Sequence, residues 1–413
     1  MDKEILRIQR NLIESFLEED RPLETMESNS TWSSIREQGS QLWLDTSNLA
    51  RATDQWTRDF RGLTTNNSLL NSRIQTGEYD EMIKRASQSL QRIGLPNEKI
   101  VHEISFLLNV LHGKRLINRF DCQVSVELHT DFARDIQRTL DYARRFSEME
   151  PERFIVKIPF TLEGIIATHQ LAGEGIPVNQ TLAFSVRQNY IIALLSDADF
   201  GNVFVGRLNH LFENHDLPKI KRLGEKVALS ANKTLKFLRR KHRTNTLQIA
   251  ASIRDGSQIM NLAGIDVLTI PPEVANEYLT LAEEKQTTGR LRVDDLLEQL
   301  DETPGHSVEK LLKVKGSLRD CVENLMEKTW QNLSSAELRS YFQSHGVDDL
   351  FPAWTADQIE QSRSQGKIPD LSKWADDLDD GSVALDSLLS LAGLNSFSRS
   401  QNEMDSRIRR LIR

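Results

Sequence analysis

The chain has 413 residues, with 52 lysines and arginines against 60 aspartates and glutamates, so its formal net charge at pH 7 is −8. A net negative charge argues against general nucleic-acid binding, and no apolar run approaches the ~20 residues of a membrane span. Cys122 and Cys321 are the only cysteines, so the chain needs no disulfide framework and suits a reducing compartment.

The N-terminal residues 1–20 place apolar side chains at helical spacing among charges, and Arg21-Pro22 ends this predicted helix. We expect it to pack on the main domain or on a second copy of the chain, as in a homodimer. Met1-Asp2-Lys3-Glu4 lacks the cationic stretch and apolar run of a signal peptide. The expected location is therefore cytoplasmic, with no membrane partner.

Eight short stretches rich in β-branched and apolar residues predict strands, and helical patterns lie between them. The expected strands are 42–47, the start of 62–70, 123–128, 154–158, 178–183, 203–207, 246–251 and 265–270. This alternation predicts an α/β fold, a single parallel (β/α)8 TIM barrel. An open, doubly wound sheet is the alternative, but no glycine-rich phosphate loop follows the first strand.

Most of these strands end in a polar side chain, and in a barrel such ends meet at one mouth, where active sites lie. A single polar residue at a strand end usually caps a helix or faces solvent. Seven of them in chain order predict a site instead: Asp45, Asn66, Glu127, Lys157, Thr181, Arg207 and Ser252.

Lys157 stands in the apolar stretch 154–161. Burial can lower the pKa of a lysine from ~10.4 by roughly 3–5 units, which makes the amine a candidate nucleophile for a carbonyl compound. Considered alone, a lysine in a strand is more often one that snorkels or forms an ion pair.

The residues after Lys157 carry a longer pattern: Glu163-Gly164-Ile165-Ile166-Ala167, then Leu171, Gly175, Ile176 and Asn179-Gln180-Thr181-Leu182-Ala183-Phe184-Ser185. This pattern, roughly thirty residues long, resembles the transaldolase family of the class I, Schiff-base-forming aldolases. The resemblance extends over about residues 42–285. It implies transfer of a dihydroxyacetone unit between sugar phosphates, from fructose 6-phosphate or sedoheptulose 7-phosphate to an aldose phosphate, in the pentose phosphate pathway. No cofactor is implied.

The resemblance also implies roles for single residues. Lys157 would form the Schiff base, Glu127 would act as acid and base through a water held with Thr181, and Asp45 would handle the proton when the carbon–carbon bond breaks. The substrate would be bound by Asn66 and Asn179 at its hydroxyls, and by Arg207, Ser252 and Arg254 at its phosphate. Glu127 and Phe204 stand where related fructose-6-phosphate aldolases carry glutamine and tyrosine, which favours the transaldolase branch.

Three positions depart from the family pattern. Asn67 replaces a proline, and the loss of the proline is expected to free a backbone dihedral in the loop that aims Asn66. Asn202 replaces a serine that contacts the ketone unit, and Phe160 is bulkier than the usual alanine or serine. We expect these departures to change the substrate rather than the type of reaction. An unusual sugar, or binding without catalysis, therefore remains as an alternative function.

The chain is expected to divide into an N-terminal helical segment (1–40), the barrel (41–290) and a helical C-terminal extension (291–413). Expected helices of the extension are 291–300, 308–325, 335–342 and 382–394. The basic segment 219–243 is interpreted as the solvated face of a helix rather than a nucleic-acid site. The nine histidines show no metal-ligand spacing, so no metal site is expected.

Overall fold

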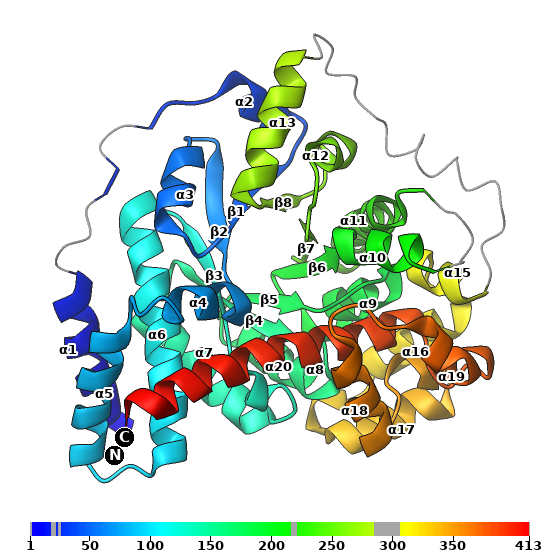
Figure 1. The fold of residues 1–413 in the computed structure, drawn as a ribbon. Helices are drawn as coiled ribbons and strands as arrows, with labels where there is room; N and C mark the ends of the chain where they lie inside the picture. The colour runs from blue at the N-terminus through cyan, green and yellow to red at the C-terminus, as the bar shows by residue number, and fades with distance from the viewer. Residues whose placement is uncertain (1, 18–21, 24–25, 216–220, 285–305, 413) are drawn as a thin grey trace.

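The computed structural model describes residues 2–17, 22–23, 26–215, 221–284 and 306–412. Eight parallel strands form a closed barrel in chain order, with β1 paired to both β2 and β8 (Figure 1). This closure confirms the predicted barrel and excludes the open sheet. The strands are β1 Gln41–Asp45, β2 Phe60–Thr64, β3 Gln123–Glu127, β4 Phe154–Pro159, β5 Val178–Thr181, β6 Phe200–Phe204, β7 Leu247–Ala251 and β8 Val267–Ile270.

Helices follow every strand and surround the barrel. They are α3 Leu49–Gln55, α4 Asn67–Ile74, α5 Asp80–Arg92, α6 Asn97–Phe120, α7 Ile136–Met149, α8 Leu162–Gly173, α9 Val186–Ile191, α10 Val205–Glu213, α11 Leu223–His242, α12 Gly256–Leu262 and α13 Pro272–Glu284. Side-chain oxygens cap several of these helices directly after a strand; Thr161, for example, accepts a hydrogen bond from Gly164 N at 2.9 Å. Such caps help to set where these helices begin at the barrel mouth.

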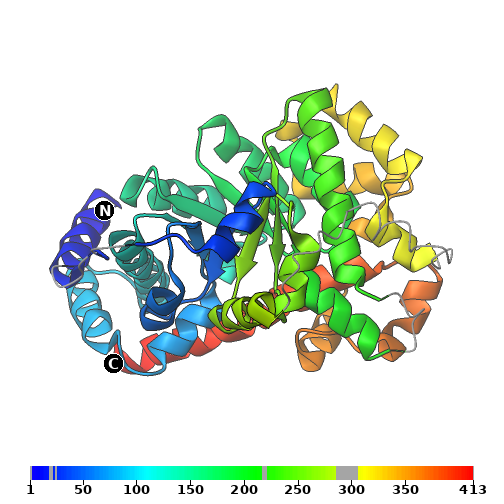
Figure 2. The same cartoon turned by 90° about the horizontal axis from the view of Figure 1, so that it is seen from above.

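Two helices precede the barrel, α1 Asp2–Leu17 and α2 Ser30–Glu37. Helix α1 packs on α5 and α6, so the structure shows the first of the two predicted placements of this helix. Its Gln9 is fully buried and donates to Glu103 Oε2 at 2.8 Å. Figures 1 and 2 both place α1 and the helices of residues 306–379 on opposite sides of the barrel. None of the described helices is long and apolar enough to cross a membrane.

Some predicted boundaries were wrong. Strand β6 ends at Phe204, so Arg207 lies in the first turn of α10 and not in a strand. The helix predicted over 308–325 is two helices, α15 His306–Leu312 and α16 Gly316–Met326. The predicted helix 291–300 and the start of the basic segment at Lys219 lie outside the described residues.

The C-terminal segment continues with α17 Ser335–Ser344, α18 Ala356–Gln365, α19 Ala375–Asp379 and α20 Leu385–Leu411. Helix α20 was predicted to end at residue 394, but it runs on through the basic residues near the C-terminus. It crosses the barrel from α18 to α4, α5 and α6, as the red ribbon in Figure 1 shows. The last helix therefore covers part of the mouth. The division into three segments remains a prediction.

The N-terminal end of α20 is held by a buried ion network. Arg187 of α9 donates to Asp386 from Nε and Nη2, both at 2.7 Å, and from Nη1 to Asp349 at 3.0 Å. Ser185 Oγ also donates to Asp386, at 2.6 Å. Because Arg187 and Asp386 are both buried, each depends on the other for compensation of its charge.

Removal of one partner of this network should destabilise the protein strongly. Asp386→Ala leaves the Arg187 guanidinium buried and short of a partner, and we expect a loss of about 3–5 kcal/mol in the free energy of unfolding. Urea denaturation measures this loss. The control is Glu360→Ala, which removes an ion pair in which the glutamate side chain is 74% exposed, and it should change stability by less than about 1 kcal/mol. Similar small losses for both variants would contradict the assigned role of the network.

Candidate active site

The register of the strands aligns three predicted residues at the barrel mouth. Glu127 on β3 pairs in register with Lys157 on β4, and Lys157 pairs with Asn179 on β5. Lys157 is 4% exposed; its Nζ lies 4.0 Å from Glu127 Oε1 and donates to Thr65 O at 3.4 Å. An amine, a carboxylate and an amide therefore stand side by side in a space largely removed from solvent.

The two carboxyl groups near Lys157 are both held above their ordinary pKa. Loss of solvent raises the pKa of Glu127 and of Asp45, and the positive charge of Lys157 opposes this shift in each case. Asp45 Oδ1 accepts a hydrogen bond from Thr64 Oγ1 at 2.8 Å, and the Thr64 hydroxyl lies 2.6 Å from that of Thr269. Such shifts suit groups that take up and release protons near neutral pH.

Asn67 has a direct structural role at this site. Its backbone N–H donates to Glu127 Oε2 at 2.8 Å, and its side chain donates to Leu128 O at 3.0 Å. Its neighbour Asn66 caps α4, because Asn66 Oδ1 accepts from Leu69 N at 2.8 Å. Asn67 is buried and tied to the carboxylate through a donor that proline lacks, so hydrogen bonds hold this residue where the family pattern has a proline ring. The expected gain in backbone freedom stays a prediction.

Arg207 is the second buried cation of the site. It is 8% exposed, and its Nη1 has no hydrogen-bond partner among the described residues. Burial and the neighbouring charge of Arg254 lower the pKa of Arg207 to about 10. The Arg207 guanidinium has no ion pair with a carboxylate among the described residues, and phosphate suits its planar set of donors.

A glycine brings the two arginines together. A Cβ on Gly206 would lie 2.3 Å from Ser252 O and 2.5 Å from Arg254 Cγ, so only glycine allows the segment after β7 to pack on the start of α10. Ser252 itself has a φ of 60°, which non-glycine residues rarely adopt, and its buried hydroxyl has no partner among the described residues.

These side chains surround a cavity of about 90 Å³. Nine of the eleven predicted residues line it: Asp45, Asn66, Lys157, Asn179, Asn202, Phe204, Arg207, Ser252 and Arg254. The other two, Glu127 and Thr181, are buried behind this lining, and Glu127 Oε1 and Thr181 Oγ1 both lack a hydrogen-bond partner among the described residues.

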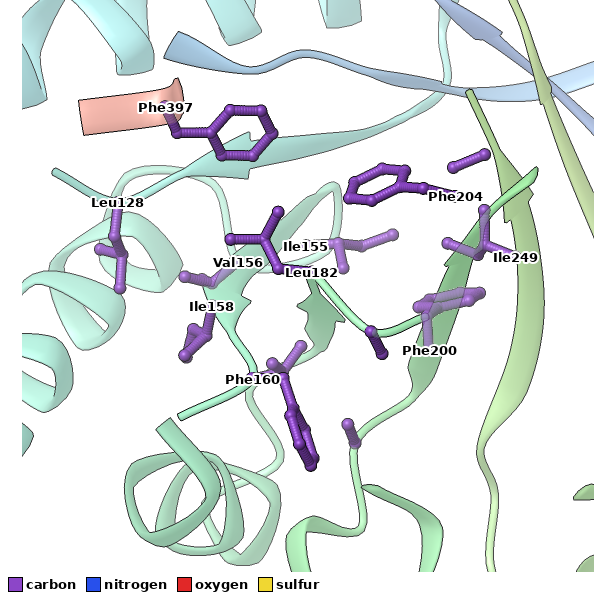
Figure 3. Packing of buried hydrophobic residues seen from close by; sticks show 14 of the residues in the cluster. Leu128, Ile155, Val156, Ile158, Phe160, Leu182, Phe200, Phe204, Ile249 and Phe397 are labelled. Atoms are coloured by element: carbon purple, nitrogen blue, oxygen red, sulfur yellow. The ribbon is translucent and has the colours of Figure 1, made fainter. Parts of the chain in front are cut away.

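Sequence reasoning missed two groups of the C-terminal segment. Phe397 of α20, which is labelled in Figure 3, lines the cavity. Its ring centroid lies 5.5 Å from Lys157 Nζ. Lys367 is a third cation near the two arginines. Burial and the charges of Arg254 and Arg207 lower the pKa of Lys367. No sequence signal could have found either residue, because both stand far beyond the stretch that carries the resemblance.

The departures Asn202 and Phe160 lie in different surroundings. Asn202 lines the cavity, donates to Asn179 Oδ1 at 3.3 Å and leaves its own Oδ1 without a partner among the described residues. Phe160 does not line the cavity: its ring points away from Phe397 in Figure 3 and stacks on Phe351 at 5.4 Å. Phe160 therefore anchors the C-terminal segment, and a direct contact with substrate is not supported.

One histidine cluster lies where α6 and the segment after β3 meet α20. The ligand-type atoms of His102, His129 and Asp131 lie within 4.8 Å of one another, the one such group of three among the described residues. Both imidazoles already have protein partners, since His102 Nε2 lies 3.3 Å from Asp131 and His129 Nε2 lies 3.1 Å from Asp405 of α20. We assign the cluster to fastening α20. Spacing in the sequence did not reveal it, because its members come from α6 and the loop after β3.

Comparison with known proteins gives one consistent result. The family described as "Transaldolase/Fructose-6-phosphate aldolase" matches residues 42–336, further than the expected limit near 285. The chain is 29% identical to a transaldolase of Saccharomyces cerevisiae over 227 residues, 53% of this chain and 67% of that protein. It is 27% identical to one of Vibrio cholerae over 260 residues (62% and 75%), and 31% identical to one of Sus scrofa over 224 residues (52% and 66%).

The hydrogen bond from Asn67 to Glu127 should be measurable through stability. A raised pKa means that the folded chain binds more protons than the unfolded chain as pH rises above the ordinary value of 4.5, so the free energy of unfolding falls through that window. Asn67→Pro removes a donor to the ionised carboxylate, which raises the pKa further and deepens the fall. Proline fits the backbone, because Asn66 is extended and Asn67 is the first residue of α4.

The matched control is Asn67→Ala, which loses the side-chain hydrogen bonds but keeps the N–H. Urea denaturation at about pH 4 and pH 8 compares the two variants. Asn67→Pro should be less stable than Asn67→Ala by up to about 1.5–3 kcal/mol at the higher pH, with a smaller difference at the lower pH. A difference that does not depend on pH would show that the N–H does not stabilise the carboxylate.

Proposed function

Because the chain belongs to the transaldolase/fructose-6-phosphate aldolase family, we propose that it transfers a dihydroxyacetone unit between sugar phosphates through a Schiff base on Lys157. The observation that carries the proposal is the placement of Lys157, buried between carboxyl groups in a cavity that also holds Arg207. This chemistry needs no cofactor. A place in the pentose phosphate pathway and in the cytoplasm follows from the same proposal.

The first step is attack of the neutral Lys157 amine on the ketone carbon of the donor. The carbinolamine then loses its hydroxyl as water, and an iminium forms. Glu127 supplies and removes protons in this step through a water held with Thr181. In support, Glu127 Oε1 and Thr181 Oγ1 are buried polar atoms without a hydrogen-bond partner among the described residues, and such atoms commonly bind ordered water.

The second step breaks the carbon–carbon bond between the α and β carbons. The iminium accepts the electron pair and becomes an enamine, while the hydroxyl on the β carbon loses its proton to Asp45 and becomes the carbonyl of the released aldehyde. Addition of an acceptor aldehyde reverses the sequence, with Asp45 returning the proton. Hydrolysis of the new iminium frees the product ketose. The raised pKa of Asp45 suits a group that must both take and give a proton.

Binding of the substrate uses two ends of the cavity. Asn66 and Asn179 hydrogen-bond the hydroxyls of the three-carbon unit, and Arg207 and Arg254 bind the phosphate with Ser252. The buried, partly unpartnered guanidinium of Arg207 supports this arrangement, because an anion would compensate its charge.

Three residues bear on the choice of reaction and substrate. Glu127 and Phe204 stand where fructose-6-phosphate aldolases resembling this chain carry glutamine and tyrosine, which favours transfer over simple aldol cleavage. A second candidate function is the same chemistry on an unusual sugar. Asn202 favours it, since its Oδ1 lines the cavity without a partner among the described residues, at a position where the family carries serine.

The Schiff base can be trapped directly. Fructose 6-phosphate with borohydride should add a three-carbon group irreversibly, and peptide mapping should place it on Lys157. Lys157→Ala should abolish both adduct and turnover, because no other group can replace an amine that becomes bonded to the substrate. Glu127→Gln should be slower by about 10²–10⁴-fold, since only acid–base assistance is lost. An adduct on another lysine would refute the mechanism, and no adduct with any sugar phosphate would favour binding without catalysis.

The phosphate assignment predicts a selective loss. Arg254→Ala should weaken phosphorylated donors by about 10–150-fold, the equivalent of one charge-assisted hydrogen bond of roughly 1.5–3 kcal/mol. Steady-state kinetics with fructose 6-phosphate and with unphosphorylated fructose makes the comparison. Equal losses for both donors would remove Arg254 from the phosphate site.

A further inference from the structure

Helix α20 covers the mouth of the barrel and places one aromatic ring over the reacting lysine. Phe397 is 5% exposed and lines the cavity. Its ring centroid lies 5.5 Å from Lys157 Nζ and 5.5 Å from the Arg207 guanidinium carbon. Phe397 stands outside the range 42–336 that matches the family, so the comparisons assign it no role.

The packing of α20 on the barrel depends on one glycine. A Cβ on Gly393 would lie 2.7 Å from Leu182 Cδ2 and 3.1 Å from Arg207 Nη1, so glycine is needed for the helix to approach this closely. Ser390 Oγ, one turn earlier, donates to Leu182 O at 2.8 Å. The helix is thus seated directly on the end of β5, and Phe397 follows Gly393 by about one turn.

The helix is also fastened on both sides of Phe397. Asp386 lies in the buried network with Arg187, and Asp405 and Arg407 pair with His129 at 3.1 Å and with Asp80 at 2.6 Å. Between these anchors, Ser400 Oγ lies 2.7 Å from Ser68 Oγ on α4. The ring is therefore held over the lysine by fixed contacts rather than by a loop.

An open side remains next to this cover. Arg254 is exposed, while Phe397, Lys157 and Arg207 are buried. The site therefore has a dry, covered end at the lysine and a wet end at Arg254. A sugar phosphate that enters with its phosphate toward the arginines would place its ketone end beneath the ring.

We propose that Phe397 is a specificity-determining residue that keeps water from the three-carbon enamine on Lys157 and so directs it to an aldehyde acceptor. The inference rests on the proposed function. A phenyl ring neither donates nor accepts protons here, so its contribution is to exclude water while leaving the open side to the acceptor.

Two fates of the enamine compete. In transfer, its carbon attacks the acceptor aldehyde, a new carbon–carbon bond forms, and the aldehyde oxygen takes up a proton. In release, the same carbon takes up a proton, water adds to the resulting iminium carbon, and the bond to Lys157 nitrogen breaks. Release yields free dihydroxyacetone and the free amine, with no oxidant or reductant needed. Hydrolysis of an iminium on Lys157 completes both fates, so the step that separates them is protonation of the enamine carbon. Phe397 covers this end of the cavity and limits the access of water, the proton source, to that carbon.

The test measures the ratio of dihydroxyacetone released to ketose transferred. The full chain is given fructose 6-phosphate and erythrose 4-phosphate, and both products are quantified. Phe397→Ala should raise the ratio by about tenfold, which corresponds to ~1.4 kcal/mol between the two barriers. Phe397→Leu should give a smaller rise, because leucine keeps part of the apolar cover. If the alanine variant folds poorly, the leucine variant provides the measurement.

The matched control is Phe351→Ala, which removes another buried ring of the C-terminal segment that contacts Phe160 instead of the cavity. It should lower stability and leave the ratio unchanged. Trace labelling with acetic anhydride gives a readout that does not depend on catalysis: Lys157 should be acetylated faster in Phe397→Ala than in the wild type or Phe351→Ala.

The outcomes separate the two proposals. A wild type that transfers, with an unchanged ratio and unchanged labelling in Phe397→Ala, overturns the role of Phe397 alone. An equal rise in Phe351→Ala also overturns it, since general loosening of the segment would then explain the effect. A wild type that forms no adduct and transfers nothing overturns the proposed function. The role of Phe397 in directing the enamine to the acceptor then falls as well.

Discussion

The shared desolvation of Lys157, Glu127 and Asp45 is the constraint on which the rest of the site depends. A buried carboxylate is costly without a nearby cation, and burial raises the pKa of both carboxyl groups while the lysine charge opposes the shift. With Lys157 Nζ 4.0 Å from Glu127 Oε1, the pKa of the Glu127 carboxyl group depends on the charge of the lysine. The closed barrel stabilises this arrangement, because the register of its strands holds Lys157 next to Glu127 on rigid backbone.

The second determinant is the cover formed by α20. A mouth open on all sides would return water to the lysine and weaken every electrostatic interaction there. The polar anchors of α20 therefore serve the site as well as stability: Asp386 and Asp405 hold the helix at its two ends, and Gly393 lets it approach the strands. A segment outside the family match has become part of the wall of the cavity.

Two of the three departures from the family pattern are explained by their contacts. Asn67 lacks the rigid ring of a proline, but its N–H donates a hydrogen bond to Glu127. This one hydrogen bond holds both the loop and the carboxylate in place. Phe160 supplies a large ring against which Phe351 stacks, which suits a chain whose C-terminal segment must dock on the barrel. Asn202, the third departure, is the one that lines the cavity, and it is the position at which we propose that substrate preference is decided.

The sequence by itself determined the barrel and pointed to nine residues around the cavity. Strand periodicity and polar residues at strand ends, which are local patterns, predicted the barrel and five of these residues. The other four came from the resemblance to the transaldolase family: Asn179, Asn202, Phe204 and Arg254. Local patterns were less reliable at boundaries: Val205 and Arg207 were assigned to a strand although they begin α10. Only the tertiary structure placed Phe397 over Lys157, Lys367 near Arg254, and Asp405 beside His129, which are separated by more than a hundred positions in each pair. Contacts between residues so far apart in the chain depend on how the C-terminal segment packs on the folded barrel. The periodicity of a segment shows which of its faces is buried, but not which other segment it packs against.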